Sequence, residues 1–231
     1  MIGELRVVQS VPTTFAEIVT SEMARVLGER ADTPSFRLGA SGGGSGGACF
    51  AALAGTEGID WARLALYFVD ERCVDVTSPD SNQHTIAQAL GSHLPELAGF
   101  YPMSCELGAA HYEALLREAG PLHLCQLGLG PDGHTASIFP NSPALEAPGD
   151  RLVVENHDLS GRNVHDRLSL TFAALAQAER LVVTVMGPDK ADALARIDAG
   201  EDLPATRVDS PLVLWLVDEP ASSKLPGTHQ A

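Results

Sequence analysis

The sequence predicts an α/β fold with a mainly parallel sheet and helices on both of its faces. Short apolar segments alternate along the chain with segments of about ten residues that have helical hydrophobic spacing, a pattern typical of βαβ units. Residues 122–129 carry almost no charge, as expected for a strand buried on both faces. Neither an internal repeat nor a long linker interrupts the 231 residues, so we expect a single domain covering residues 1–231.

The first part of the chain contains an expected strand–helix–strand–helix–strand unit. Thr14, with Glu17 three positions later, has the pattern of a capping box and is expected to begin the first helix. The apolar residues of this helix recur with helical spacing: Phe15, Ile18, Val19, Met23, Val26 and Leu27. The second helix is expected from the apolar run 48–54. The strands around these helices are expected at residues 4–9, 36–41 and 63–69.

The remaining elements continue the alternation. Asn82 is expected near the start of the next helix. The later helices are expected at residues 84–90, 108–118, 172–178 and 189–197, with a short one near the C-terminus. The later strands are expected at residues 122–129, 152–155, 168–171, 181–186 and 212–218. Residues 141–166 mix Pro, Gly, Asn and charged residues, so we expect loops over the functional site there.

The charge balance limits the classes of partner. Thirty acidic residues oppose fifteen basic ones, which gives a net charge of −15. This argues against nucleic acid and against an anionic membrane surface as partners. A small anionic substrate remains compatible, because a few local cations and backbone N–H groups can hold a phosphate. Composition does not choose between a monomer and a dimer.

The cysteines and the N-terminus indicate the compartment. Cys49, Cys73, Cys105 and Cys125 lack C-x-x-C spacing, which favours reduced thiols over a disulfide or a metal site. The N-terminus has an early acidic residue, Glu4, and no apolar signal region, and no apolar run approaches membrane-spanning length. We therefore expect a soluble, cytoplasmic protein without a metal site.

The strongest candidate for a functional site follows the buried strand at 122–129. Glycines and a proline break the pattern there, and the turn places Asp132 and His134 beyond the end of the strand. Ligands of open α/β sheets bind outside the carboxyl ends of the strands, and a carboxylate beside an imidazole suits proton transfer. Pro-Asp-Gly is also ordinary turn chemistry, so the pattern alone leaves a purely structural role open.

A glycine-rich turn follows the strand at 36–41. Residues Ser41, Gly42, Gly43, Gly44 and Ser45 can bring backbone N–H groups at a helix start close to a phosphate. The segment also satisfies G-x-G-x-x-G, and Asp70 follows the last of these glycines by about 20 positions, as in dinucleotide-binding folds. NAD binding and a turn without a ligand therefore stay open as alternatives to phosphate binding.

Two segments resemble a known family. The stretch LGLGPDGHTASIFP, residues 127–140, resembles the signature of the 6-phosphogluconolactonases, a branch of the sugar-phosphate isomerase and deaminase superfamily. Asp70-Glu71-Arg72, with a Ser-Asn pair ten residues later, resembles the family's D-E-R…S-N pattern, and Arg72 favours the lactonase branch over the deaminases. Without the resemblance, such a triplet is often a solvated charge cluster.

The C-terminal half extends the resemblance to the two cations Arg167 and Lys190. Residues 167–171 resemble the family's R-[IV]-[ST]-L-T strand, and residues 186–190 resemble its G-x-x-K turn. The chain departs from the family at 161–166, where Lys-Pro-Pro usually precedes the arginine. His165 lies in this departing segment and is not assigned a catalytic role. The other histidines lack metal-ligand spacing and are expected to be structural or exposed.

The resemblance implies a Rossmann-like fold of the sugar-phosphate isomerase type and hydrolysis of 6-phospho-D-glucono-1,5-lactone in the oxidative pentose phosphate pathway. From the chemistry of the residues we expect His134 to activate water as a general base and Asp132 to orient the imidazole or its water. We expect Arg72 or the backbone N–H groups of residues 42–45 to meet the charge of the oxyanion. The expected substrate-binding and phosphate-binding residues are Ser41, Gly42, Gly43, Gly44, Ser45, Asp70, Arg167 and Lys190. Neither a cofactor nor a metal is expected. An amino-sugar phosphate deaminase or isomerase and a non-catalytic sugar-phosphate sensor remain alternatives.

Overall fold

A seven-stranded parallel sheet forms the centre of the computed structural model, which describes residues 3–30 and 32–226. The strand order is β1-β10-β9-β6-β2-β3-β5, and each neighbouring pair is parallel. In chain order these strands are β1 (Glu4–Val7), β2 (Phe36–Ala40), β3 (Leu64–Phe68), β5 (Gly99–Tyr101), β6 (Leu124–Gly128), β9 (Leu181–Val185) and β10 (Val213–Val217). The predicted α/β fold with a mainly parallel sheet is confirmed.

A second, antiparallel sheet of three strands was not predicted as a separate unit. It consists of β4 (Asp70–Arg72), β8 (Arg167–Leu170) and β7 (Val153–Asn156), with β8 in the middle. In the pairing of β4 with β8, Arg72 lies opposite Arg167. The small sheet therefore brings together two segments that are far apart in the sequence.

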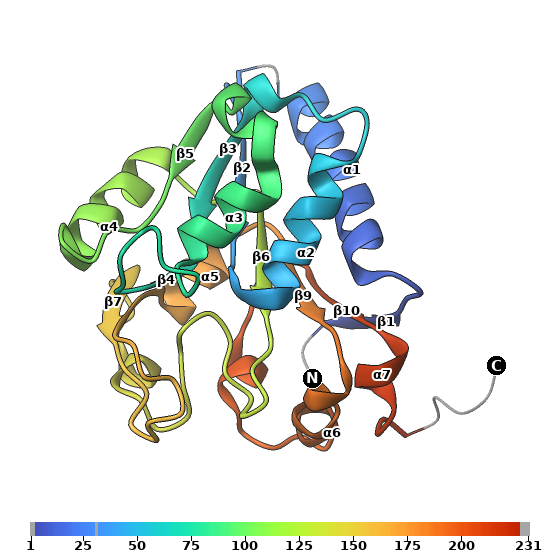
Figure 1. Ribbon diagram of the computed structural model, residues 1–231, viewed down its shortest axis with the longest axis vertical. Coiled ribbons are helices and arrows are strands. Elements are labelled where there is room, and N and C mark those ends of the chain that lie inside the picture. Colours follow the sequence, from blue (N-terminus) through green and yellow to red (C-terminus); the bar gives the residue numbers. More distant parts are fainter. Residues whose placement is uncertain (1–2, 31, 227–231) are drawn as a thin grey trace.

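The described part of the chain also contains seven α-helices. They are α1 (Val11–Glu29), α2 (Gly43–Ala54), α3 (Asn82–Leu90), α4 (Gly108–Ala119), α5 (Phe172–Gln177), α6 (Ala191–Asp198) and α7 (Glu219–Ser222). Figure 1 shows α1, α2 and α3 side by side in front of the sheet, whereas α4 and α5 contact strands of the small sheet. Within the described residues, none of these helices is long and apolar enough to cross a membrane.

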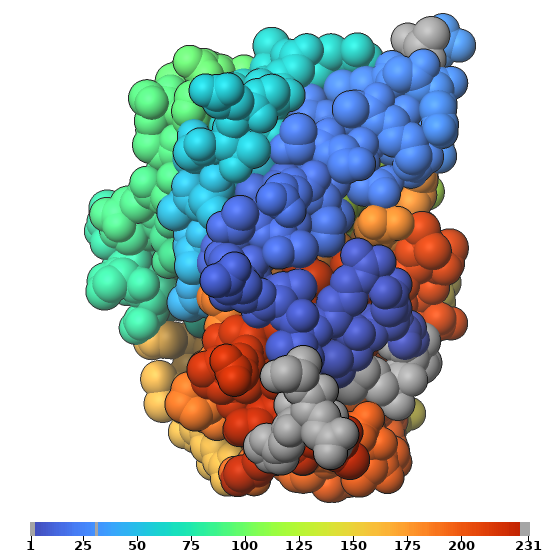
Figure 2. All heavy atoms as spheres, turned by 90° about the vertical axis from the view of Figure 1, so that its right-hand side faces the viewer, coloured from blue at the N-terminus to red at the C-terminus, as the bar shows by residue number. Residues whose placement is uncertain are grey.

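The first and the last strand of the described chain are neighbours in the sheet. The N-terminal strand β1 pairs in parallel with β10 near the C-terminus. In the view of Figure 2, the N-terminal segment (blue) accordingly lies against C-terminal elements (red). β1 is mostly exposed, whereas β10 is buried at each of its residues. β1 is therefore an edge strand, and β10 lies inside the sheet.

Several element boundaries differ from the prediction. Helix α1 begins at Val11, and Ser10 is its N-cap, because the Ser10 side chain accepts a hydrogen bond from the Thr13 backbone N–H at 3.3 Å. The predicted start at Thr14 is therefore wrong. Helix α2 begins within the glycine-rich turn, at Gly43, five residues before the predicted start. The low helix propensity of glycine led the prediction to start the helix after the glycines. In the structure these residues are helical, and α2 packs against α1 and α3.

The prediction of four reduced cysteines is also wrong. Cys73 and Cys105 form a disulfide, whereas Cys49 and Cys125 are free and buried. Cys73 follows β4, and Cys105 follows β5. Strands β3 and β5 are neighbours, so the loops that extend from them meet although the two cysteines lie 32 residues apart. The sequence spacing carries no sign of this proximity.

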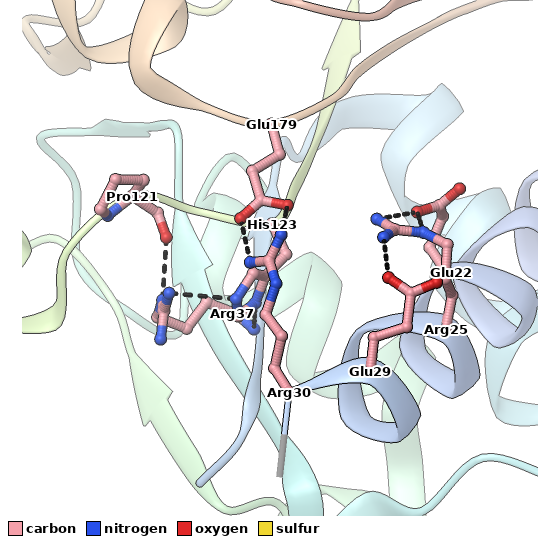
Figure 3. A network of polar contacts seen from close by, with 8 residues as sticks. All are labelled: Glu22, Arg25, Glu29, Arg30, Arg37, Pro121, His123 and Glu179. Atoms are coloured by element: carbon pink, nitrogen blue, oxygen red, sulfur yellow. Dashed lines mark hydrogen bonds and ion pairs between the residues drawn. The ribbon is translucent and has the colours of Figure 1, made fainter. Parts of the chain in front are cut away.

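Polar groups stabilise the amino ends of the central strands (Figure 3). The imidazole of His123, which precedes β6, accepts the backbone N–H of Arg37 in β2 at Nδ1, at 2.9 Å. Arg37 also donates to the Pro121 carbonyl at 2.9 Å. Next to them, Arg30 at the end of α1 donates two hydrogen bonds to Glu179, which precedes β9. These contacts tie α1 and three strands together at the edge opposite the carboxyl ends.

Candidate active site

A cavity of about 450 Å³ lies at the carboxyl ends of the parallel strands. The loops that follow β2, β3, β6 and β9 all reach it, because the parallel arrangement directs them to the same edge of the sheet. The predicted site residues among its walls are Ser41, Gly42, Gly43, Gly44, Ser45, Asp70, Arg72, His134, Arg167 and Lys190. Asp132 lies behind His134 and does not line the cavity.

His134 and Asp132 form a hydrogen-bonded pair after β6. The Nδ1 atom of His134 lies 2.5 Å from Oδ1 of Asp132, which also accepts the backbone N–H of His134 at 3.2 Å. A carboxylate can only accept here, so in the neutral imidazole the proton lies on Nδ1 and the lone pair lies on Nε2. Burial acts to raise the pKa of Asp132, but the hydrogen bonds and charge of His134 outweigh it, and the pKa is lowered.

The turn that carries this pair depends on Gly130. A Cβ atom at this position would lie 2.0 Å from Nδ1 of His134 and 2.7 Å from Oδ1 of Asp132. The Gly130 N–H donates to the His134 carbonyl at 2.8 Å, and the Gly133 N–H donates to the Gly130 carbonyl at 3.0 Å. The loop thus closes on itself, and a residue without a side chain at 130 leaves room for the pair.

The glycine turn presents the start of α2 to the cavity. Its N-cap residue, Gly42, makes no side-chain capping bond, and Gly43 has a positive φ of 70°. Backbone N–H groups of the first helical turn are therefore available to an anion. The side chain of Gln126 in β6 accepts the Ser41 N–H at 3.0 Å and donates to the Thr184 hydroxyl in β9 at 2.8 Å. These two bonds fix the start of the turn.

Three cations line the cavity. Arg167 is 5% exposed, and its Nε and Nη1 atoms have no hydrogen-bond partner among the described residues. Burial, with the nearby positive charge of Arg72, lowers the pKa of Arg167 to about 10. Arg72 donates to the Asp80 carbonyl at 2.6 Å, and the Lys190 ammonium lies 2.9 Å from Asp189. Arg167 is thus a buried cation with N–H groups free for a ligand.

Glu71 holds the strand that carries Arg72. Its carboxylate accepts the backbone N–H groups of Asn82 and Gln83 at the start of α3, each at 2.7 Å, and that of Arg72 at 2.7 Å. Burial raises the pKa of Glu71 although these N–H groups oppose the rise. A carboxylate at a helix N-terminus is a favourable arrangement, so β4 and α3 fix each other.

Asp70 connects three segments of the site. Its carboxylate accepts hydrogen bonds from the hydroxyl of Ser137 at 2.6 Å, the amide of Asn82 at 3.2 Å and the hydroxyl of Ser41 at 3.4 Å. The side chain is 5% exposed and lines the cavity. Asp70 therefore links the glycine turn and α3 to the loop that carries His134.

Several further residues of the wall were not assigned from the sequence, among them Asn82, Ser137, Phe139 and Asn163. The Phe139 ring lies edge-on to the His134 ring, with centroids 4.9 Å apart, and the Arg167 guanidinium lies 5.9 Å from its centre. Ser137 and Phe139 stand in the signature segment, and Asn82 stands in the D-E-R…S-N pattern, so the motifs already contained them. Asn163 stands in the segment that departs from the family pattern.

The described residues contain no cluster of three or more His, Cys, Asp or Glu side chains that could hold a metal ion. The other histidines within residues 3–226 lie outside the walls of the cavity. His165, for example, lies 3.1 Å from the carboxylate of Asp80 in an ion-pair geometry near the surface.

The fold and the cavity together define an α/β protein of the sugar-phosphate isomerase and lactonase class. The family described as "Glucosamine-6-phosphate isomerases/6-phosphogluconolactonase" matches residues 8–215, and the chain belongs to this family. The chain is 34% identical over 227 residues to a 6-phosphogluconolactonase of Synechocystis, with 90% of each chain covered. It is 32% identical over 237 residues to a 6-phosphogluconolactonase of Streptomyces coelicolor, with 88% of each covered.

A solved structure supports the same assignment. The crystal structure of 6-phosphogluconolactonase from Thermotoga maritima superimposes with a TM-score of 0.78 at 26% identity. The match covers 94% of this chain and 99% of that chain.

Proposed function

We propose that the protein hydrolyses 6-phospho-D-glucono-1,5-lactone to 6-phospho-D-gluconate, as a cytoplasmic enzyme of the oxidative pentose phosphate pathway. The observation that carries the proposal is that His134, paired with Asp132, lines a cavity together with the buried Arg167, whose Nε and Nη1 have no hydrogen-bond partner among the described residues. The pair of His134 and Asp132 suits proton transfer, and the guanidinium of Arg167 suits the binding of a phosphate. The lactonase names of the relatives agree with this chemistry.

In the proposed mechanism, His134 acts as the general base. Its Nε2 atom takes a proton from a water molecule while the water oxygen attacks the lactone carbonyl carbon. When the tetrahedral intermediate collapses, the bond from carbon to ring oxygen breaks, and the imidazolium returns the proton to that oxygen. Asp132 orients the imidazole and stabilises its positive charge, as its 2.5 Å contact with Nδ1 allows.

The negative charge that develops on the carbonyl oxygen needs donors. Arg72 and the backbone N–H groups of residues 42–45 are the candidates, since both line the cavity. One well-placed donor of this kind contributes about 3 kcal/mol to the stability of the transition state.

The substrate phosphate is assigned to the remaining cations. Arg167 can bind it through the two N–H-bearing atoms that lack partners, and Lys190 adds a point charge. Ser41, the glycine turn and Ser45 complete the proposed phosphate site at the start of α2, with Asp70 holding the turn in place.

The test is a rapid lactone-hydrolysis assay corrected for spontaneous ring opening. We expect His134→Ala to lower kcat by about a hundred- to ten-thousand-fold, because the general base is lost. His157→Ala is the matched control, since His157 is exposed and does not line the cavity. A His134→Ala variant with the wild-type rate would refute the role of His134.

Both alternatives predict no enzymatic hydrolysis of the lactone, and two further assays distinguish them. A sugar-phosphate sensor binds the product 6-phosphogluconate but never accelerates hydrolysis above the spontaneous rate. A deaminase releases ammonia from glucosamine 6-phosphate without hydrolysing the lactone. Either result with the wild-type protein would reject lactonase activity, and titration with NADPH tests the dinucleotide alternative separately.

A further inference from the structure

The loop of residues 158–166, between β7 and β8, contributes one residue to the cavity. This residue is Asn163, and it lines the wall together with the cations and His134. The loop is the segment that lacks the family's Lys-Pro-Pro pattern.

The loop is closed around the carboxylate of Asp158. Oδ1 of Asp158 accepts the Ser160 backbone N–H at 2.8 Å, and Oδ2 accepts the Asn163 backbone N–H at 3.1 Å and the Asn163 side-chain Nδ2 at 2.8 Å. The Gly161 N–H donates to the Asp158 carbonyl at 3.1 Å. Asp158 is 8% exposed, and these donors outweigh the effect of its burial, lowering its pKa to about 2. The carboxylate thus fixes the position of Asn163.

The end of the loop is attached to the segment that follows β4. The Cys73 N–H donates to the Asp166 carbonyl at 2.8 Å, and the His165 imidazole lies 3.1 Å from the Asp80 carboxylate. Figure 1 shows this loop, in yellow to orange, at the lower edge of the molecule near β4 and β7. Asp158 therefore holds Asn163, and the segment that follows β4 holds the end of the loop.

The contact with Asp158 also fixes which way the amide of Asn163 is turned. A carboxylate accepts only from the NH₂ end, so Nδ2 faces Asp158 and the carbonyl oxygen Oδ1 is the opposite end. Oδ1 receives no hydrogen bond from the described residues. A neutral carbonyl oxygen cannot donate to a phosphate, but it can accept from a hydroxyl. The lactone of the proposed reaction carries hydroxyl groups on its ring.

We propose that Asn163 is a specificity-determining residue, whose Oδ1 accepts a hydrogen bond from a ring hydroxyl of the sugar, and that Asp158 is its positioning residue. This inference rests on the proposed lactonase function. It assigns the sugar ring to the side of the cavity formed by the 158–166 loop, and the phosphate to Arg167, Lys190 and the glycine turn.

The test compares the natural lactone with 6-phospholactones that each lack one ring hydroxyl. For the wild type, kcat/KM should fall about tenfold for one of these deoxy lactones, because a neutral hydrogen bond is lost. Asn163→Ala should lower kcat/KM for the natural lactone by a similar factor and should show no further loss with that deoxy lactone. The inhibition constant of inorganic phosphate should stay unchanged, since phosphate contacts other residues.

Asp158→Asn is the second variant, because it keeps the shape of the side chain but replaces one of the two acceptor oxygens by an NH₂ donor, which cannot accept the N–H groups of Ser160 or Asn163. It should reduce the discrimination between the natural and the deoxy lactone while leaving phosphate inhibition unchanged. Equal losses for all lactones in both variants would overturn the inference, since Asn163 would then only stabilise the loop. A wild type without any lactonase activity would instead refute the proposed function.

Discussion

Gly130 and Arg167 show how single residues shape the site for a ligand although other residues would suit the stability of the fold better. Gly130 gives up a side chain so that His134 and Asp132 can approach each other. Arg167 keeps a charge in a position that is 5% exposed, with two nitrogens unpaired within the described residues. Both choices make the ligand-free protein less stable than other residues at these positions would. Replacing either residue therefore gives a testable prediction.

Replacing Gly130 should disturb catalysis directly. The added methyl group of Gly130→Ala would lie 2.0 Å from Nδ1 of His134, so the imidazole must move. A displacement of about 1 Å lowers kcat by about a hundredfold. Gly149→Ala, where a Cβ meets nothing within 4 Å, should keep the wild-type kcat. A Gly130→Ala variant with normal kcat in the lactone assay would show that the pair tolerates this shift.

Replacing Arg167 by an apolar residue should stabilise the free protein. Its pKa of about 10 lies below the ordinary value, so the fold disfavours the charged form, and removal of the charge is favourable. We expect Arg167→Met to raise the free energy of unfolding by about 1–2 kcal/mol in urea titrations. Inorganic phosphate should raise Tm for the wild type but not for Arg167→Met. A less stable variant would contradict this account.

Among the secondary-structure elements, the small antiparallel sheet positions two of the three cations of the site. It places Arg72 of β4 opposite Arg167 of β8, although the two residues are far apart in the chain. The loops around it are joined by the Cys73–Cys105 disulfide and by the backbone bond from Cys73 to Asp166. The geometry of the cation pair therefore depends on contacts outside the parallel sheet.

Removing the disulfide should lower stability. The bridge closes a segment with a sequence separation of 32 residues, for which loop-closure entropy gives about 3–4 kcal/mol. We expect Cys73→Ser with Cys105→Ser to lower the free energy of unfolding by this order, and dithiothreitol to lower that of the wild type similarly. Thiol titration of the unreduced, unfolded wild type should find two thiols, and finding four would rule the bridge out.

The central strands could be predicted because their signals are local. Apolar runs marked six of the seven parallel strands, while β5, three residues that include a glycine, gave no such signal. The pairing of Cys73 with Cys105 depends on strands that meet only in the folded chain. Motifs located His134 and the cations, but Asn163 stands outside any motif, and its place at the cavity follows from the closed loop around Asp158.

At the scale of the whole molecule, the parallel sheet separates two polar regions. The cavity lies at the carboxyl ends of the strands, and the network around His123 and Arg37 lies at the amino ends (Figure 3). Burial, with the charge of Arg37, lowers the pKa of His123 to about 4. His123 is thus neutral in the folded protein, and its nitrogen can accept the Arg37 N–H.

This network should make stability depend on pH. The unfolded chain protonates His123 near its ordinary pKa of 6.5, whereas the folded chain resists protonation down to about pH 4. Stability is therefore lost as the pH falls through this window, by about 2 kcal/mol between pH 7 and pH 5. His123→Gln should show a smaller loss in urea unfolding at these two pH values. His157→Gln should keep the wild-type dependence, and an unchanged dependence in His123→Gln would refute the assignment.

The separation of the two edges also has a consequence for protein engineering. Substitutions around His123 and Arg37 alter thermal tolerance on the side of the sheet away from the reacting groups, whereas changes in the 158–166 loop alter the choice of sugar. A laboratory selection could therefore improve heat resistance first and retarget the enzyme to a different sugar acid afterwards, with little interference between the two rounds.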